Sequence, residues 1–245
     1  MIFFNKTKPF LKDLIPNDFV DIHSHLLPGI DDGAKTIEDT LYLINGLKEI
    51  GFTEFITTPH VLKSVWDNSK TKIEETHKAT SIELHTNSIN NSFKAAAEYM
   101  MDESFLHLFE KEKLLVLKDN YVLVEMSYLY PPLNLYDIIF NLQVAGYVPV
   151  LAHPERYNFY HSNLNEYKKL KKVGCYFQMN MLSSAGYYGP DVAKTADYLL
   201  QNNMIDFVGS DVHHDKHLSF FDKKIIIKNI EPFKEAFLNN YFFKS

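Results

Sequence analysis

The chain is 245 residues long, with 46% hydrophobic and 23% charged side chains, the balance of a globular protein with a sizeable buried core. Its formal net charge of −6 argues against a general binder of nucleic-acid phosphates, and the densest lysine group, KKLKK at 168–172, has the spacing of a solvated helix face. The single cysteine excludes an intrachain disulfide, and no run approaches the roughly 18 apolar residues that span a bilayer, so we expect a cytoplasmic protein without nucleic-acid partner or transmembrane segment.

Short strand-like runs alternate with helical patterns from residue 19 onward. We predict strands at 19–23, 54–60, 95–100, 121–126, 147–153, 175–180 and 205–211. Helices are expected at 37–50, 70–90, 133–145, 164–173, 190–202 and 229–241, the first of them opened by a capping box of Thr36 and Asp39. Seven alternations without a shift in composition favour a closed parallel α/β barrel, and a doubly wound open sheet is the alternative. We expect a single domain over 1–245, with residues 1–17 as an N-terminal arm.

Side chains that bind metal ions recur where the predicted strands end. These candidates are His23, His25, Asp32, His60, Glu98, Glu125, His153, Asp211 and His213. Taken singly, a histidine at a strand end is more often structural, and an Asp-Asp-Gly sequence is more often a turn. In a parallel barrel, however, the carboxyl ends of all strands meet at one rim, so their recurrence at this position indicates a shared metal centre.

The chemistry of the candidates narrows the metals and the reaction. Imidazole and carboxylate ligands without thiolate suit Mn²⁺, Fe or Zn²⁺, and one carboxylate can bridge two ions. Paired metal ions activate water and stabilise in-line displacement at phosphorus. The residues alone therefore favour a metal cluster, and such a cluster could support displacement at phosphorus.

Six motifs resemble a known superfamily in order and spacing. DIHSHLLPGIDDG (21–33) resembles the N-terminal signature of the polymerase and histidinol phosphatase (PHP) superfamily. ITTPH, AEY, VEMS, AHPERY and GSDVHH, at 56–60, 97–99, 124–127, 152–157 and 209–214, resemble its capsule-associated branch, the bacterial manganese-dependent protein-tyrosine phosphatases. The resemblance runs from about residue 16 to 217. It implies a distorted (β/α)7 barrel and a trinuclear metal centre, with Mn²⁺ expected ahead of Fe, Zn²⁺ or Mg²⁺. The implied substrate is a phosphotyrosine-containing protein, the tail of a cognate tyrosine kinase that controls exopolysaccharide export.

The resemblance also implies how the ligands are shared. One metal would be held by His23, His25, Glu125 and Asp211. A second would be held by His60, Glu125 and His153, with Glu125 bridging, and Asp32, Glu98 and His213 would complete the third site. The family can carry a second arginine shortly after the Asp-x-His motif. This chain has none there, so that role is in doubt or is taken by Lys216 or His217.

Arg156 is the only arginine in the chain, which otherwise uses lysine at its 24 other basic positions. A guanidinium makes two parallel hydrogen bonds to phosphate oxygens and stays charged, whereas lysine is a single hydrated charge. The resemblance implies that Arg156 is the catalytic residue that grips the phosphoryl group, with His213 or His217 protonating the leaving phenolate. The structural alternative is an ion pair between Arg156 and Glu155.

Competing functions remain open at this point. A cysteine-dependent phosphatase is excluded, because the position six residues after Cys175 is Met181 and not arginine. A PHP phosphatase of a small ester such as histidinol phosphate, an amidohydrolase-like enzyme and a catalytically inactive kinase-binding module are the alternatives. The 61–70 loop with Trp66, like Tyr187 and Tyr188, either flanks an aromatic substrate or packs the protein.

Overall fold

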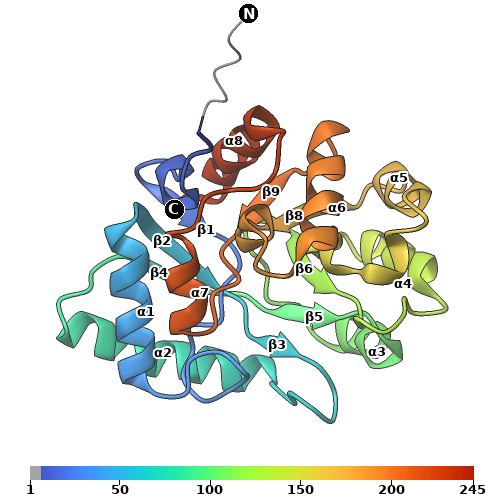
Figure 1. The fold of residues 1–245 in the computed structure, drawn as a ribbon. Coiled ribbons are helices and arrows are strands. Elements are labelled where there is room, and N and C mark those ends of the chain that lie inside the picture. The colour runs from blue at the N-terminus through green and yellow to red at the C-terminus, as the bar shows by residue number, and fades with distance from the viewer. Residues whose placement is uncertain (1–6) are drawn as a thin grey trace, which may run out of the picture.

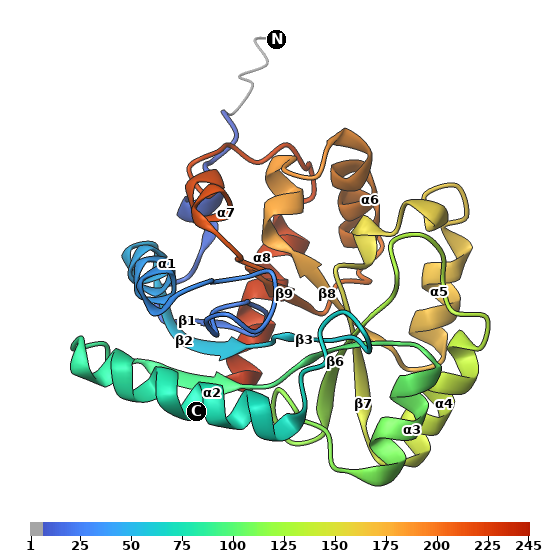
Figure 2. The same cartoon turned by 90° about the horizontal axis from the view of Figure 1, so that it is seen from below.

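A computed structural model describes residues 7–245, and in it the helices surround the strands (Figures 1 and 2). The strands are β1 (Phe19–Asp21), β2 (Phe52–Thr57), β3 (His60–Val61), β4 (Ser92–Ala95), β5 (Glu98–Met100), β6 (Tyr121–Glu125), β7 (Val148–Ala152), β8 (Tyr176–Asn180) and β9 (Phe207–Gly209). The helices are α1 (Ile37–Glu49), α2 (Lys70–Thr86), α3 (Glu103–Lys111), α4 (Leu135–Val144), α5 (Asn165–Lys172), α6 (Pro190–Gln201), α7 (Asp215–Phe220) and α8 (Ile230–Asn239).

The strands follow one another in chain order, and every pairing between them is parallel. One sheet has the order β1-β2-β4 and the other the order β3-β5-β6-β7-β8-β9. Because β2 and β3 are one predicted strand interrupted at Thr58 and Pro59, and β4 and β5 another, the nine short strands correspond to seven. The chain that follows β1 meets the chain that follows β9, where Asp211 N–H donates to the His23 carbonyl at 2.7 Å. The prediction of a distorted (β/α)7 barrel is confirmed.

The helices form largely where capping and periodicity predict them. The capping box of Thr36 and Asp39 is present at the start of α1. The sequence analysis missed α3 and α7, which have nine and six residues and therefore show little periodicity. The side chain of Asp102 caps α3 by accepting a hydrogen bond from the Phe105 N–H, a start signal that could have been read.

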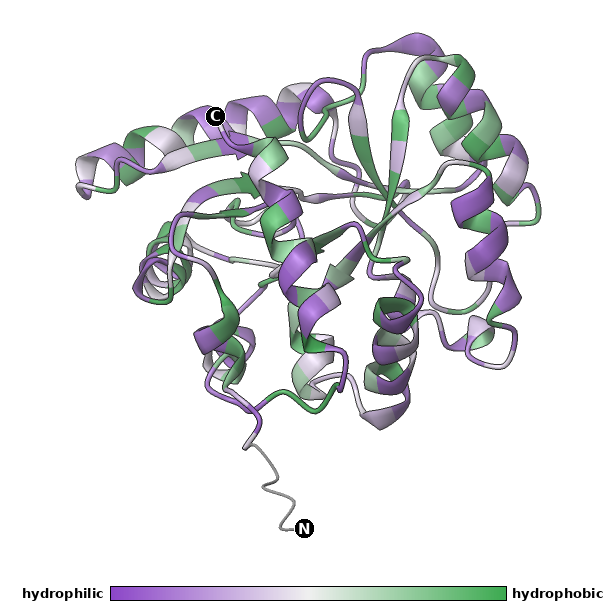
Figure 3. Cartoon of the chain, turned by 90° about the horizontal axis from the view of Figure 1, so that it is seen from above, coloured by the Kyte–Doolittle hydropathy of each residue, from purple (hydrophilic) through white to green (hydrophobic). Residues whose placement is uncertain are grey.

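The strands are apolar on both of their faces below the carboxyl ends. Val122, Leu123, Val124, Leu151 and Phe177 have no exposed surface, as expected for parallel strands covered on both faces. Figure 3 shows hydrophobic residues on the central strands and hydrophilic ones on much of the helices' outer surface. A tightly packed base of this kind fixes the positions at which the strands end and the polar rim begins.

The expected N-terminal arm packs on its own chain over the residues described, and its first six residues lie outside them. Leu11 is fully buried, and its N–H donates to the Lys223 carbonyl at 2.9 Å. The Ile225 N–H donates in turn to the Pro9 carbonyl at 3.1 Å. No helix within 7–245 combines the length and the apolar character that crossing a membrane requires.

Cys175 is expected to be chemically inert in the folded protein. The residue is 1% exposed, and burial raises the pKa of its thiol to about 12, so thiolate is scarce near neutral pH. A thiol reagent such as iodoacetamide should modify Cys175 rapidly only in denaturant, as followed by intact mass. Fast modification of the native protein together with loss of activity would contradict this placement.

Candidate metal centre

All nine predicted ligands gather at the carboxyl ends of the strands. Their donor atoms form four overlapping groups, within each of which the atoms lie within 4.8 Å of one another. The groups are His25, Asp32, His60 and His213; His23, Glu98 and His153; His23, His25 and Asp211; and His60, Glu98 and Glu125. The rim therefore assembles the residues that the sequence singled out from six separate segments.

Two of these residues have a backbone conformation that is unusual outside glycine. His153, directly after β7, has φ 35°, and Asp211, two residues after the end of β9, has φ 49°, both in the left-handed region. A hydrogen bond from the His153 N–H to the Gln178 carbonyl, at 2.7 Å, fixes the first of these bends. Strained backbone of this kind persists where the surrounding structure enforces it, and it often marks functional sites.

Glu98 is the carboxylate at the middle of the cluster. Its Oε1 lies 2.9 Å from His153 Nε2, and its Oε2 lies 3.2 Å from both His23 Nε2 and His60 Nδ1. Burial opposes ionisation, but the charges of His23 and His60 lower the pKa of Glu98 well below its usual range. Glu125 Oε1 lies 2.9 Å from His60 Nδ1. The family resemblance implies that Glu125 is the carboxylate shared between two metal ions. In the structure Glu98 contacts more histidines than Glu125 does, so Glu98 is the more central carboxylate.

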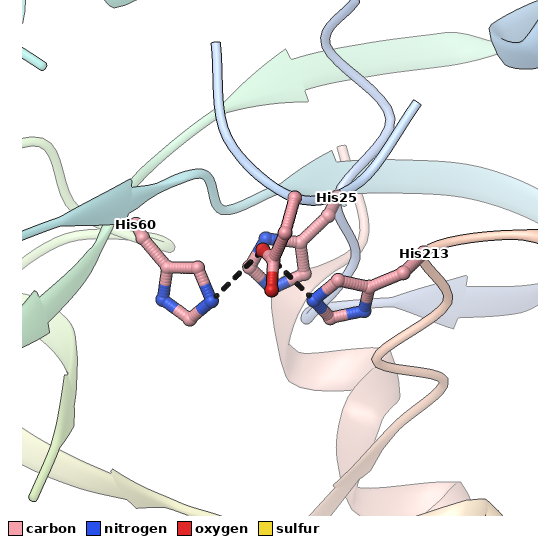
Figure 4. A group of neighbouring side chains, drawn as sticks. His25, His60 and His213 are labelled. Atoms are coloured by element: carbon pink, nitrogen blue, oxygen red, sulfur yellow. Dashed lines mark ion pairs between the residues drawn. The ribbon is translucent and has the colours of Figure 1, made fainter. Parts of the chain in front are cut away.

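Asp32 forms the open side of the cluster. Its side chain is 54% exposed, and its Oδ1 lies 3.5 Å from both His60 Nε2 and His213 Nε2 (Figure 4). The ring of His25 stacks on that of His213 with centroids 3.9 Å apart. Since Glu98, Glu125 and Asp211 are buried, the cluster is open to solvent on the side of Asp32.

A second layer of polar residues, which the sequence analysis did not assign to the site, orients the ligands. Gln178 Oε1 lies 2.6 Å from His23 Nδ1, and Asp31 Oδ2 lies 2.8 Å from His25 Nδ1. Both contacts leave Nε2 of the histidine facing the cluster. Asn180 Nδ2 donates to Asp211 Oδ2 at 2.7 Å. Gln178 and Asn180 lie two residues apart on one face of an otherwise apolar strand end, which is a signal the sequence did offer.

Replacing Gln178 with leucine tests this second layer. Without its acceptor, the His23 ring loses its fixed orientation, so we expect metal affinity to fall by about 10- to 100-fold. Titration of metal-free protein with Mn²⁺, followed by calorimetry, measures the change. Gln143→Leu is the matched control, because Gln143 bonds the Val173 carbonyl and no ligand. If both variants bind Mn²⁺ with the same affinity, Gln178 does not help to orient a metal ligand.

The donor set fits a group of bound divalent metal ions. His23 Nε2 and His25 Nε2 face each other at 3.3 Å, and both also lie 3.3 to 3.4 Å from Asp211 Oδ1. Two ring nitrogens and a carboxylate oxygen that converge in a buried space are the arrangement a cation satisfies. The donors are nitrogen and oxygen without sulfur, which suits Mn²⁺, Fe or Zn²⁺.

Arg156 lies against this cluster and between two tyrosine rings. Its Nη1 donates to Asp211 Oδ2 at 2.7 Å, while Oδ1 of the same carboxylate faces the histidines. The guanidinium carbon lies 4.8 Å from the ring centroid of Tyr128 and 4.1 Å from that of Tyr188. Glu155, the alternative partner considered from sequence, instead accepts hydrogen bonds from Asn180 N–H and Ser183 Oγ. The Arg156 side chain remains 19% exposed at the rim.

The remaining candidates differ in what they can contribute. His217 is buried, and burial lowers the pKa of its ring to about 3, so it is neutral near pH 7 and does not replace a cationic arginine. Lys216 is exposed on α7.

Trp66 is partly buried and, with Phe105 and Leu108 of α3, lines a hollow of about 420 Å³ beside β3. Tyr187 packs against His217 with ring centroids 4.7 Å apart, whereas Tyr188 contacts Arg156.

A parallel barrel with imidazole and carboxylate donors on its carboxyl rim is the architecture of metal-dependent hydrolases. The family model for capsular polysaccharide synthesis, CpsB/CapC, matches residues 19–219, and the chain belongs to this family. Tyrosine-protein phosphatase YwqE of Bacillus subtilis is 29% identical over 208 residues, which cover 84% of this chain and 82% of that protein. Tyrosine-protein phosphatase CpsB of Streptococcus pneumoniae is 28% identical over 204 residues, covering 80% of this chain and 83% of that protein.

Solved structures agree with this placement. A structure from the study of YwqE and CpsB, described there as unique metal-dependent tyrosine phosphatases, aligns with a TM-score of 0.77 at 27% identity. The alignment covers 92% of this chain and 88% of the other. An amidohydrolase from Mycoplasma synoviae aligns with a TM-score of 0.53 at 12% identity, covering 97% of this chain and 91% of the other, which shows a shared fold alone.

Proposed function

We propose that this protein is a metal-dependent phosphatase that hydrolyses phosphotyrosine in a protein substrate. The observation that carries the proposal is the position of the only arginine, whose Nη1 lies 2.7 Å from Asp211 within a cluster of nine metal-binding side chains. Relatives over more than three quarters of the chain are named tyrosine-protein phosphatases. A phosphate clamp beside a metal centre is what transfer of a phosphoryl group to water requires.

The nine clustered residues would hold the metal ions, with Mn²⁺ the expected metal. We propose that Glu98 is the shared carboxylate, with His23 and His153 on one side and His60 and Glu125 on the other. Asp211 would bind a metal ion together with His23 and His25, and Asp32 would bind one together with His60 and His213. When bound, such ions lower the pKa of water and polarise the phosphoryl oxygens.

Arg156 would hold the phosphoryl group in a fixed orientation. Its planar fork gives two parallel hydrogen bonds to equatorial oxygens and neutralises the charge that they carry. The flanking rings of Tyr128 and Tyr188 keep the guanidinium plane from turning, and Asp211 holds one of its edges. An aryl ring of the substrate would enter beside Tyr128, which is 45% exposed.

Departure of the tyrosine phenolate needs little help, because phenolate is a good leaving group. We propose that His213 donates a proton when its Nε2 does not hold a metal ion, and that His217 donates a hydrogen bond. His213 Nδ1 lies 2.8 Å from the Asp211 carbonyl, so this nitrogen carries hydrogen and Nε2 faces Asp32. His217 is neutral at pH 7, so its ring would donate a hydrogen bond to the departing oxygen but would not transfer a proton to it.

The partner we propose is the tyrosine-phosphorylated tail of a bacterial tyrosine kinase in exopolysaccharide export. This proposal follows from the family resemblance and is supported by the family's place in capsular polysaccharide synthesis.

A substrate panel tests the function. Protein loaded with Mn²⁺ should hydrolyse phosphotyrosine peptides well ahead of histidinol phosphate, and a chelator should abolish the activity. Activity confined to small esters would favour the histidinol phosphate alternative and overturn the assignment to protein substrates. Stoichiometric metal without turnover on any substrate would favour the inactive binding module.

A further inference from the structure

An apolar hollow lies beside the candidate active site. It has a volume of about 310 Å³, near the lower limit for ligand pockets and suited to one large side chain. We call it the 131–160 hollow, after its apolar lining residues Pro131, Pro132, Leu133, Tyr136, Phe159 and Tyr160. None of these residues has a part in the proposed chemistry.

The hollow is continuous with the segments that hold Arg156. One wall begins three residues after Tyr128, whose ring covers the guanidinium of Arg156. The other wall begins three residues after Arg156 itself, with Phe159 stacked on Tyr157 at 5.6 Å between centroids. Since three residues of chain span at most about 11 Å, the two walls start within that distance, Cα to Cα, of Tyr128 and Arg156.

Several large apolar side chains near the hollow are exposed to solvent. Leu129 is 80% exposed, Tyr130 is 65% exposed and Leu133 is fully exposed, and all three lie between the active site and α4. Apolar side chains gathered at one exposed place mark an interaction site more often than scattered ones do. The adjacent prolines restrict the backbone, so the wall is preformed.

The one charged group at the hollow's edge already has partners. Glu166 accepts hydrogen bonds from Lys169 Nζ at 2.6 Å and from the Tyr136 hydroxyl at 3.1 Å. The carboxylate is therefore neutralised within the protein. The occupant that fits is an uncharged apolar or aromatic side chain.

We propose that the 131–160 hollow binds an apolar or aromatic side chain of the phosphotyrosine-bearing polypeptide, two to four residues from the phosphotyrosine. The inference rests on the proposed function, since it needs a polypeptide whose phosphotyrosine reaches Arg156. The hollow adjoins the segments that carry Arg156, which favours the substrate polypeptide as its occupant. A second copy of this protein or a lipid surface bound on this face would obstruct access to the active site. The hollow thereby provides a contact that a small phosphate ester cannot use.

The test compares peptides that differ in one flanking position. The parent peptide carries phosphotyrosine among serines, and each of the others places one leucine at a position from four before to four after it. We expect one position to raise kcat/KM about tenfold, the gain from burying one leucine side chain. The variant Leu133→Ser should abolish that gain while leaving hydrolysis of phenyl phosphate unchanged. Leu238→Ser, at a 55% exposed leucine on α8, is the matched control and should behave as the wild type.

Three results would overturn the inference. One is the absence of any positional preference in the wild type. Another is an equal loss on peptide and phenyl phosphate in Leu133→Ser. The third is unchanged peptide kinetics in Leu133→Ser together with loss of self-association on sedimentation or of binding to anionic vesicles, which would assign the face to another occupant. If the wild type hydrolyses phenyl phosphate but no phosphotyrosine peptide, the proposed function itself fails, a result distinct from peptide turnover without preference.

Discussion

Replacing Arg156 with lysine is expected to lower kcat on a phosphotyrosine peptide by about 100-fold or more while metal content stays unchanged. Lysine keeps the positive charge but loses the planar fork that makes two parallel hydrogen bonds. It also loses stacking between Tyr128 and Tyr188, whose ring centroids lie 4.8 and 4.1 Å from the guanidinium carbon. Steady-state kinetics with metal analysis of the same samples measure both quantities.

The control for Arg156→Lys is a nearby cation outside the clamp. Lys216 is exposed on α7, and Lys216→Ala should change kcat far less than Arg156→Lys does. A fall of similar size would mean that Lys216 replaces the missing second arginine of the family. Near wild-type kcat in Arg156→Lys would leave Arg156 as a structural partner of Asp211 only.

Replacing Glu98 with glutamine is expected to remove bound metal as well as activity. The amide keeps the size of the side chain but removes the charge that faces His23, His60 and His153. We expect metal affinity to fall by at least about 100-fold, beyond the usual loss for residues that only orient a ligand. Elemental analysis after dialysis gives the number of ions retained per chain.

Glu125→Gln is the informative comparison, because the family resemblance gave Glu125 the bridging role. In the structure Glu125 contacts His60 at 2.9 Å, at the edge of the group that Glu98 joins. We therefore expect Glu125→Gln to lose fewer ions than Glu98→Gln. The opposite order would return the shared role to Glu125.

The architecture and the clustering of the candidate ligands could be predicted because each depends on local pattern. Parallel strands covered on both faces are continuously apolar, and this made β6, β7 and β8 recognisable. His153 directly follows β7, so placing that strand also placed His153 at the rim. The interruption at Pro59 divided a predicted strand without moving His60 from the rim.

What could not be predicted depends on side-chain reach across the barrel. Glu98 begins β5 and Glu125 ends the neighbouring β6, and only the structure shows that Glu98 reaches three histidines within 3.2 Å. The rings of Tyr128 and Tyr188 meet at Arg156 from segments 60 residues apart in sequence. The structural alternative considered from sequence paired Arg156 with its neighbour Glu155, whereas in the structure Arg156 contacts Asp211, 55 residues further along the chain.

The measurement that tests the central claim most directly is the return of activity with metal. Protein freed of metal by a chelator and dialysed should not hydrolyse a phosphotyrosine peptide. Stepwise addition of Mn²⁺ should restore turnover in proportion to the metal bound, and Arg156→Lys should bind the same amount without regaining the rate. Full turnover by the metal-free protein, or full metal binding with no turnover in the wild type, would contradict a metal-dependent phosphotyrosine phosphatase.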